Sequence, residues 1–244
     1  TISKGILEAI ALGVTELRVA SRGNDAYYRE SASIAIELKL LGGYNGETWE
    51  RDVSNNKTKI ISSNSTTISI FGVTHSVLLE GFAVYNDAPA PIEKQLVLIQ
   101  DCSGEITVTN NYIYADTGNR AHGIHIGNSS PVIKNNVIET GHATVQVLNI
   151  SSILGSPVIF NNILIIGDSL DSMGIRLNDS DNTKIYNNTI IGCATPVQTC
   201  QGIYFYYSAN AEFINNIFVM LNGSSNNFVI NDGIYNSDTI IAYN

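Results

Sequence analysis

One pattern of apolar and polar positions recurs along the chain at nearly regular intervals. An apolar residue, any residue, two asparagines, any residue and a second apolar residue occur at 108–113, 133–138, 159–164, 185–190 and 213–218. The first asparagine of each pair follows the previous one by 25, 26, 26 and 28 residues. Residues 79–84 look like an earlier copy, with Gly81 in place of the first asparagine. A fixed period of this length indicates a solenoid of stacked repeats.

A second pattern precedes most of these copies by about ten residues. Residues 123–126, 144–147, 174–177 and 202–205 alternate apolar and polar side chains, which is typical of a strand with one buried face. Each repeat then holds three short strands separated by turns rich in Gly, Asn, Asp and Ser. About 25 residues at about 3.3 Å per residue suffice for one lap around a narrow three-sided core. We predict an all-β, single-stranded parallel β-helix. A leucine-rich repeat has a similar period, but it needs a helical return path, and residues 139–156 lack helical character.

Stacking of the laps assigns a role to the asparagine pairs. The flanking apolar positions should form two inward columns of branched aliphatic side chains. Asparagine and glycine both tolerate positive φ, so the first residue of each pair should form a left-handed corner between two strands. We expect the same residues to form a buried amide ladder from lap to lap: Asn110, Asn135, Asn161, Asn187 and Asn215.

The two ends of the chain differ from the repeats. Ile2, Ile6 and Ile10 recur every four residues, Ser3 can cap and Gly13 can end the run, so residues 3–12 should form an amphipathic helix. Such a helix would cover the open end of the core. Residues 239–244 look like the start of another lap, so we expect either a longer natural protein or a partner covering that end. We treat 1–244 as one domain, with a cap at 1–13 and stacked laps at 34–244.

Composition and charge narrow the range of functions. The 244 residues are 44% hydrophobic and 14% charged, enough to form a continuous core. A net charge of −9 disfavours nucleic acid as a partner. No run approaches the roughly 18 apolar residues of a membrane span, and we expect any signal segment to have been removed. Cys193 and Cys200 either close a short disulfide in an oxidising compartment or, like Cys102, are small buried hydrophobic residues.

These strings resemble those of the right-handed parallel β-helix superfamily, which includes pectate-lyase-like and polygalacturonase-like proteins. The opening residues 1–10 and the segments 41–45 and 49–52 are similar to the start of many bacterial secreted or surface members. The likeness covers almost the whole chain and implies the fold. It does not select an activity, because lyases, hydrolases, epimerases, adhesins and proteins without known activity share this fold. It implies a secreted or cell-surface location.

In enzymes of this superfamily the chemistry usually lies along the outer face of one strand column. The resemblance therefore points to the outward middle residues of the second pattern, which we expect to stack on successive laps: His125, Gln146, Arg176 and Tyr204. His125, Arg176 and Tyr204 would be catalytic if the protein is an enzyme, because Tyr and Arg can abstract a proton α to a carboxylate and stabilise the resulting charge. Gln146, His142, Asp168 and Asp171 would contact a substrate. The alternative is that these are ordinary polar residues of an exposed sheet.

Other chemistries find less support in the sequence. Glycoside hydrolysis requires two closely spaced carboxyl groups, whereas Asp116 and Asp168 should lie two laps apart. His122 and His125 should face opposite sides of a strand, which disfavours zinc. Ca²⁺ is the one cofactor we consider, at Asp179 and Asp181 in the oxygen-rich turn 178–182.

Two hypotheses for function remain from the sequence. The first is a non-catalytic extracellular repeat protein that binds a polysaccharide or another surface. The second is a polysaccharide lyase or epimerase acting on a glycan that contains uronic acid.

Overall fold

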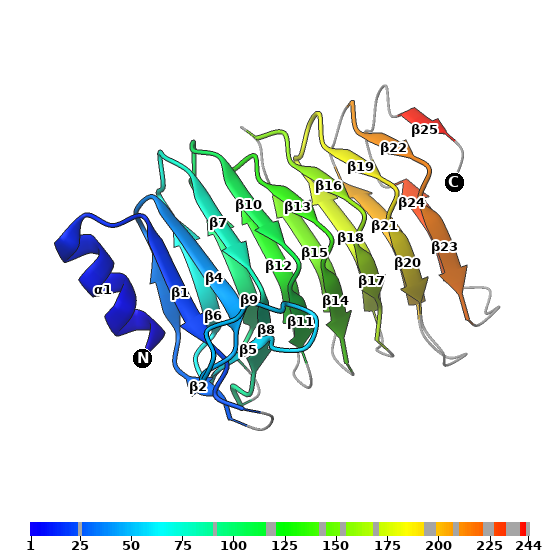
Figure 1. Ribbon diagram of the computed structural model, residues 1–244. Helices are drawn as coiled ribbons and strands as arrows, with labels where there is room; N and C mark the ends of the chain where they lie inside the picture. Colours follow the sequence, from blue (N-terminus) through cyan, green and yellow to red (C-terminus); the bar gives the residue numbers. More distant parts are fainter. Residues whose placement is uncertain are drawn as a thin grey trace.

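The computed structural model describes residues 1–23, 26–89, 92–115, 121–141, 145–151, 155–167, 171–192, 199–206, 210–221, 227–232 and 240–242. In these residues, one helix, α1 (Ile2–Leu12), is followed by 25 strands that wind around a common core and form three long sheets (Figure 1). Every pair of neighbouring strands is parallel, as expected when each lap of the chain stacks on the previous one. The prediction of a parallel β-helix is confirmed.

The three sheets take one strand each from every lap. Sheet A has nine strands: β1 (Glu16–Ala20), β4 (Leu38–Tyr44), β7 (Val77–Glu80), β10 (Ile106–Thr109), β13 (Val132–Lys134), β16 (Val158–Phe160), β19 (Lys184–Tyr186), β22 (Glu212–Ile214) and β25 (Ile240–Ala242). Sheet B has eight: β2 (Tyr28–Arg29), β5 (Thr58–Ser62), β8 (Phe82–Asn86), β11 (Tyr112–Ala115), β14 (Val137–Thr140), β17 (Ile163–Ile165), β20 (Thr189–Gly192) and β23 (Ile217–Met220). Sheet C has eight: β3 (Ala32–Ile34), β6 (Thr66–Phe71), β9 (Lys94–Gln100), β12 (Ala121–Gly127), β15 (Val145–Ser151), β18 (Asp171–Asn178), β21 (Thr199–Tyr206) and β24 (Asn227–Asp232).

The inward columns follow the predicted register. In sheet A the paired and fully buried positions are Val108, Ile133, Ile159, Ile185 and Phe213. In sheet B they are Ile113, Ile138, Leu164 and Ile190, and the next residue in register, Phe218, is partly buried. Branched aliphatic side chains thus fill the core from lap to lap.

The asparagine pairs lie at the corner between sheets A and B, and the sequence prediction for them is half right. The first asparagines, Asn110, Asn135, Asn161, Asn187 and Asn215, all have φ of 54–56°, so the left-handed corner is confirmed. The prediction that these residues form the buried ladder is wrong. The left-handed conformation turns their side chains away from the core, and Asn135, Asn161, Asn187 and Asn215 are exposed.

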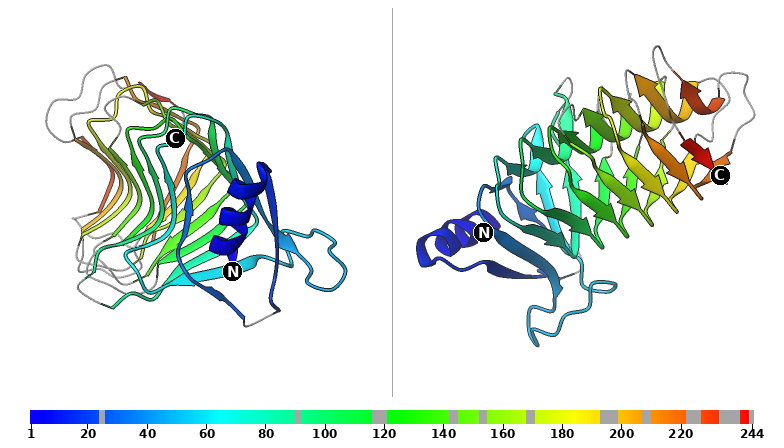
Figure 2. Two further views of the ribbon diagram at one scale, coloured as in Figure 1. Left: turned by 90° about the vertical axis from the view of Figure 1, so that its left-hand side faces the viewer. Right: turned by 90° about the horizontal axis from the view of Figure 1, so that it is seen from above.

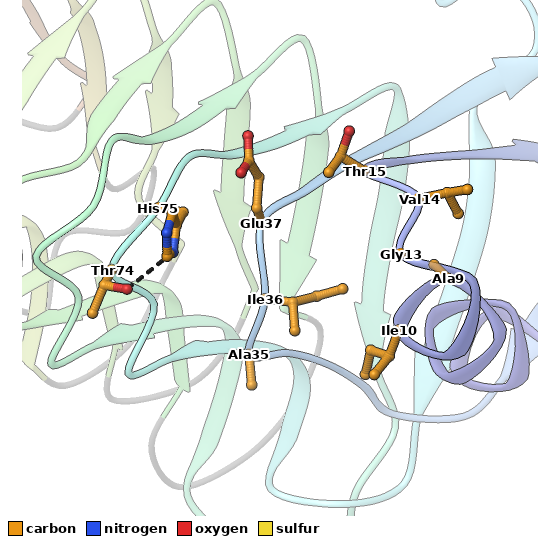
Figure 3. A pocket seen from close by; sticks show the side chains of 10 residues that line it. All are labelled: Ala9, Ile10, Gly13, Val14, Thr15, Ala35, Ile36, Glu37, Thr74 and His75. Carbon is orange, nitrogen blue, oxygen red and sulfur yellow. Dashed lines mark hydrogen bonds between the residues drawn. The ribbon is translucent and has the colours of Figure 1, made fainter.

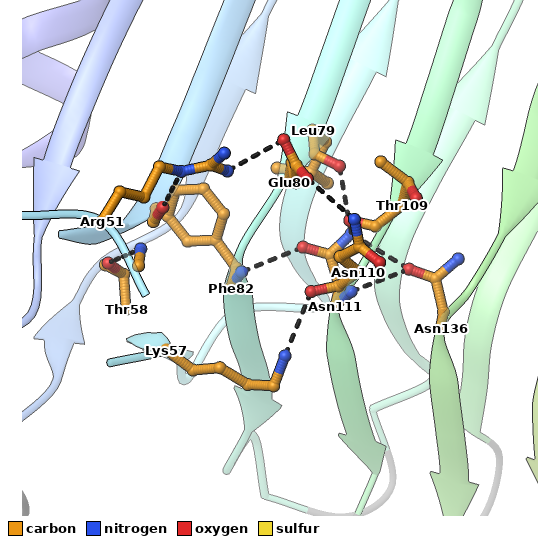
Figure 4. Close-up of polar contacts among 12 residues, drawn as sticks. Arg51, Lys57, Thr58, Leu79, Glu80, Phe82, Thr109, Asn110, Asn111 and Asn136 are labelled. Carbon is orange, nitrogen blue, oxygen red and sulfur yellow. Dashed lines mark hydrogen bonds and ion pairs between the residues drawn. The ribbon is translucent and has the colours of Figure 1, made fainter. Parts of the chain in front are cut away.

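The second asparagines form the buried ladder instead: Asn111, Asn136, Asn162, Asn188 and Asn216. The Nδ2 group of each of the first four donates to Oδ1 of the next, over 3.0–3.1 Å. That same Oδ1 also accepts the backbone N–H of the previous lap's asparagine, for example from Asn136 to Asn162 over 3.0 Å. At the N-terminal end the ladder stops at Phe82, whose backbone N–H donates to Asn111 Oδ1 over 3.0 Å (Figure 4).

A loop formed by residues 45–57 is fixed to the outer side of this corner (Figures 2 and 4). Asn110 Nδ2 donates to Glu80 over 2.8 Å, and the Arg51 guanidinium lies 2.8 Å from the same carboxylate. Lys57 Nζ donates to the Asn110 carbonyl over 3.1 Å. Burial lowers the pKa of Lys57, although Glu80 opposes that shift. Asn110, the first of the outer asparagines, thus anchors a loop, whereas the inner row links successive laps.

Helix α1 covers the N-terminal end of the core, as predicted, and packs against β1 and β3. Its buried residues are Ile2, Ile6 and Ala9, whereas Ile10, predicted to share the buried face, is 48% exposed. The helix ends at Gly13, which has φ 65°. The described residues contain no helix that is long and apolar enough to cross a membrane.

The predicted N-cap is wrong by two residues, because Thr1 rather than Ser3 caps the helix. The Ser3 hydroxyl donates to Glu30, and the same carboxylate accepts the backbone N–H groups of Ile2 and Ser3 over 2.7 and 2.9 Å. Burial alone would raise the pKa of Glu30, but these hydrogen bonds outweigh it and lower that pKa.

Candidate functional site

The strands of sheet C are bent, and the bend shapes the outer face. A regular strand alternates inward and outward side chains, but these strands place two successive residues in the core. The buried pairs are Thr67 and Ile68, Leu96 and Val97, Gly123 and Ile124, Val147 and Leu148, Gly174 and Ile175, and Gly202 and Ile203. Two successive inward residues turn the strand toward the core, so the outer face is concave along this line (Figure 2, left).

Close packing explains the glycines at the bend. A Cβ atom at Gly174 would lie 2.5 Å from the Gly202 carbonyl oxygen of the next lap. A Cβ atom at Gly123 would lie 2.4 Å from Ile138 and 2.7 Å from the Val147 carbonyl oxygen. The Gly-Ile strings of the sequence therefore mark the bend.

The residue after each buried pair points outward and stacks on its equivalents in neighbouring laps. Strand register gives the column His125, Asn149, Arg176 and Tyr204. We call these four residues the outer column. The structure thus brings together His125, Arg176 and Tyr204, as the sequence predicted.

Gln146 is not part of the outer column, so its predicted place there is wrong. It pairs with His122 on one side and Met173 on the other, three positions before Asn149. The alternation of residues 144–147 was misleading because the bend in β15 comes afterwards, at Val147 and Leu148. Asn149, which sequence reasoning missed, lies 24 residues after His125 and 27 before Arg176, so the repeat length was the signal that could have found it.

His122 and His125 lie on the same face of β12, which corrects the prediction of opposite faces. Their ring centroids are 5.5 Å apart, because the bend at Gly123 and Ile124 lies between them. His122 Nε2 is 2.8 Å from a Glu93 carboxylate oxygen. The His125 Nδ1 atom lies 3.2 Å from Asn149 Nδ2, a donor, so the imidazole carries its proton on Nε2.

Burial, reinforced by the neighbouring His122, lowers the pKa of His125 to about 4, whereas Glu93 acts in the opposite direction. His125 is therefore neutral at pH 7. A neutral imidazole with a proton on Nε2 is a hydrogen-bond donor for a ligand hydroxyl or carbonyl group and a weak base.

Arg176 and Tyr204 form the C-terminal half of the described site. Within the described part of the chain, Arg176 Nε is buried and has no hydrogen-bond partner, and the same holds for Gln201 Oε1. Tyr204 lies beside Arg176 in register, and its ring stacks on that of Tyr206 at 6.5 Å and 17°. The face therefore offers an incompletely paired cation next to two aromatic rings.

Several predicted residues cannot be placed in the site. His142, Asp168 and Asp116 lie outside the described residues, as does Cys193. Cys200 is disulfide-bonded, so of the two alternatives for this cysteine the bridge is the one observed. The side chains of Gln146 and Asp171 also lie outside them, although the backbone of Asp171 begins β18 and pairs with Thr199. Cys102 is a buried free thiol.

The turn after β18 holds the two residues predicted to bind Ca²⁺. Asp179 has φ 49°, and its carboxylate lies 3.4 Å from Asn178 Nδ2, while Asp181 is exposed. Within the described ranges, no group of three or more His, Cys, Asp or Glu side chains is placed to hold a metal ion. A Ca²⁺ site at Asp179 and Asp181 stays a prediction.

Two hollows lie near the N-terminal end, away from the outer column. One of about 470 Å³ is lined by α1 residues such as Ile10 and by the turns that carry Glu37 and His75 (Figure 3). The other, of about 420 Å³, is lined by Arg22, Asn45 and their neighbours. Neither includes a residue of the outer column.

Solved structures that are similar to this chain include the following two. One is the enzymatically active domain of bacteriophage CBA120 tailspike protein 2, at 12% identity and a TM-score of 0.44, with 92% of this chain and 40% of that chain covered. The other is the A-module of Azotobacter vinelandii mannuronan C-5 epimerase AlgE4, at 13% identity and a TM-score of 0.42, with 99% and 90% covered. This chain thus spans less than half the length of the tailspike domain.

A search of curated proteins found no match. A family model described as the right handed beta helix region matches residues 48–241, which is most of the chain. The protein therefore belongs to the right-handed β-helix family.

Proposed function

We propose that the outer face of sheet C binds a polysaccharide that contains acidic sugars, and that the protein is a glycan-binding solenoid of the cell surface or extracellular space. The observation that carries the proposal is the buried Nε of Arg176, which has no hydrogen-bond partner among the described residues. A buried donor without a partner costs about 1–3 kcal/mol. A ligand carboxylate would supply the missing acceptor, because the guanidinium fork binds carboxylates with two parallel hydrogen bonds.

The neighbours of Arg176 suit the rest of a sugar chain. Tyr204 and Tyr206 present aromatic surface that can pack against the C–H groups of a pyranose ring. Asn149 and neutral His125 offer hydrogen-bonding groups for hydroxyls. Neighbouring laps lie about 4.8 Å apart, so a glycan lying along the solenoid would meet a new outer-column residue at every lap.

The net negative charge of the protein bears on how Arg176 could bind an acidic glycan. A chain with net charge −9 repels anionic polymers at long range, so binding of an acidic glycan must depend on a specific cation. Arg176 fills that role in the outer column.

Calorimetric titration with oligogalacturonate and oligomannuronate tests the proposal. Arg176→Ala should weaken binding at least about tenfold, and Arg176→Lys should restore it only in part, because an ammonium lacks the planar fork. Lys134→Ala is the matched control, since Lys134 is a cation on the outer face of sheet A, where it lies over Phe160. Absence of saturable binding of either oligomer, or equal affinities for the wild-type protein and Arg176→Ala, would refute the proposal.

A second function, lyase or epimerase action on a uronate, is favoured by one observation. Arg176 and Tyr204 are direct register partners on β18 and β21. Arg176 would neutralise the carboxylate of the sugar while a base removes the proton from the adjacent carbon. His125 is a poor base because of its low pKa, which leaves Tyr204 for that role.

The two functions are distinguished by their products. A lyase breaks the C–O bond at C4 after proton removal and leaves a C4–C5 double bond that absorbs ultraviolet light. An epimerase returns a proton to the opposite face of the sugar carbon. In heavy water this proton is a deuteron, so the product contains deuterium. If the protein binds a uronate polymer but produces neither ultraviolet absorbance nor deuterium incorporation with any such polymer, the lyase or epimerase function is refuted and the non-catalytic function is retained.

A further inference from the structure

A cluster of four tyrosines occupies the outer face of sheet B, away from the outer column. We call Tyr27, Tyr85, Tyr112 and Tyr114 the tyrosine cluster. The rings of Tyr27 and Tyr85 meet edge to face at 5.4 Å, and Tyr85 contacts both Tyr112 and Tyr114 at 6.2 Å. Tyr112 and Tyr114 are nearly parallel to each other, with an interplanar angle of 6°. All four side chains are partly exposed.

Strand register shows how the cluster is assembled. Tyr85 on β8 pairs with Tyr114 on β11, and Tyr112 pairs with Ala83, whose small side chain is covered. Charged side chains also lie beside the rings. The Lys59 ammonium lies 5.7 Å from the Tyr27 ring centroid, and the Tyr112 hydroxyl donates to Glu139 over 2.9 Å.

The solenoid itself does not require tyrosine at these positions. In the following laps the equivalents of Tyr112 are Val137, Ile163 and Thr189. The equivalents of Tyr114 beyond Glu139 are Ile165 and Ile191. These strands pair in the same register without a ring, so stacking of the laps does not explain why tyrosines are concentrated in one place.

Burial raises the pKa of both Tyr85 and Tyr112, and the nearby Glu139 adds to the effect. The phenols therefore stay protonated at neutral pH and act as neutral hydrogen-bonding groups. The rings of Tyr85 and Tyr112 therefore present a neutral surface.

We propose that the tyrosine cluster is a second glycan site, which binds a neutral, extended oligosaccharide. The aromatic rings would cover the C–H faces of pyranose rings, and the phenol, ammonium and carboxylate groups would bind their hydroxyls. Chains of β-1,4-linked pyranoses are flat and extended, which matches an exposed sheet face. This site is independent of Arg176, and Glu139 at its border disfavours acidic sugars, while the Arg22 guanidinium donates to the backbone carbonyl of Tyr27.

Titration with cellohexaose, mannohexaose and xylohexaose tests the proposal. At least one should bind saturably. Tyr114→Ala should weaken that binding about tenfold, whereas Tyr114→Phe should keep most of it because the ring remains. Ile191→Ala is the matched control, because it removes a side chain from the same column three strands away and should leave the affinity unchanged.

A measurement on the wild-type protein covers the case in which Tyr114→Ala fails to fold. With ring-labelled tyrosine, the bound hexasaccharide should shift tyrosine ring resonances that Tyr85→Phe and Tyr114→Phe assign to the cluster.

Lack of saturable binding of all three hexasaccharides would overturn the proposal, as would binding that Tyr114→Ala leaves intact. A dimer in sedimentation that Tyr114→Ala dissociates would also overturn it and identify this face as an interface between copies. Arg176→Ala should leave hexasaccharide binding unchanged, so the failure of one site is distinguishable from the failure of the other.

Discussion

The outer faces of sheets B and C are built on the same laps but differ in shape and chemistry. Strands β11, β14, β17 and β20 of sheet B alternate regularly, and the outer face of the sheet carries tyrosines near the N-terminal end and exposed aliphatic residues such as Ile163 and Ile217 farther on. Strands of sheet C bury two successive residues, and their concave outer face carries His, Asn, Arg and Tyr. Because the core repeats at every lap, the laps differ mainly at their outward positions, and both proposed binding sites lie there.

The two faces also depend on different supports. Each strand of sheet B from β11 to β23 begins just after a ladder asparagine, whereas β12, β18 and β21 of sheet C turn at a glycine. A substitution in the ladder should therefore affect mainly sheet B, and a substitution at the bend should affect mainly sheet C.

The largest effect should come from the ladder that precedes sheet B. Asn162→Ala removes the acceptor of the Asn136 backbone N–H and the donor to Asn188, and should lower the free energy of unfolding by about 3 kcal/mol. Asn161→Ala changes an exposed side chain and should cost about 1 kcal/mol, because alanine tolerates φ of 55° less well. Urea denaturation checks both values. Equal losses for the two variants would contradict the assignment of the ladder to the second asparagine.

A smaller loss of stability is expected at the bend of sheet C. Gly174→Ala places a Cβ atom 2.5 Å from the Gly202 carbonyl and should cost about 2 kcal/mol. It should also weaken binding at Arg176, two residues away, without affecting the tyrosine cluster. Thr189→Ala, on the outer face of sheet B, should change stability by less than about 0.5 kcal/mol. A melting temperature of Gly174→Ala equal to that of the wild type would show that the bend does not need glycine.

The pH dependence of stability should carry a signature of His125 on sheet C. Its pKa is about 4 in the folded protein and about 6.5 when unfolded, so the unfolded state alone takes up a proton between these values. Stability should therefore fall as the pH decreases from about 6.5 to 4, by about 1–2 kcal/mol after allowance for partial exposure. Denaturation curves of wild type and His125→Asn between pH 4 and 7.5 test this. Parallel pH profiles for the two proteins would contradict it.

The smallest effect is expected where the helix meets the first lap. The pKa of Glu30 is lowered by hydrogen bonds from Ser3 and Ile2, so its contribution is present above the ordinary carboxyl pKa and is lost as the pH falls through the folded-state value. Glu30→Gln should reduce stability at pH 7 by up to about 1 kcal/mol, with a smaller difference at pH 3. Stability of the variant equal to wild type at pH 7 would show that this contact is unimportant.

The sequence predicted the structure correctly at positions where a residue type has a single structural role. Apolar columns such as Ile133 to Ile159 follow from the repeat length, because a parallel stack aligns equivalent positions. Two adjacent asparagines such as Asn135 and Asn136 cannot be told apart by type, and only the φ angle of the first decides which one enters the core.

The candidate site was harder to predict because it depends on the bend in sheet C. The bend interrupts the period-two alternation. As a result Asn149, not Gln146, lies in the outer column, and His122 lies beside His125. Contacts made by side chains far apart in sequence, such as Glu93 with His122 and Tyr85 with Tyr114, carry no local sequence signal.

Chemical-shift mapping of one labelled sample tests most directly whether the two faces bind different sugars. Oligogalacturonate or oligomannuronate should shift resonances of His125, Arg176 and Tyr204, and subsequent addition of the neutral hexasaccharide should shift those of Tyr85 and Tyr114 without displacing the first ligand. Competition between the two ligands, or shifts of both on one face, would contradict the account.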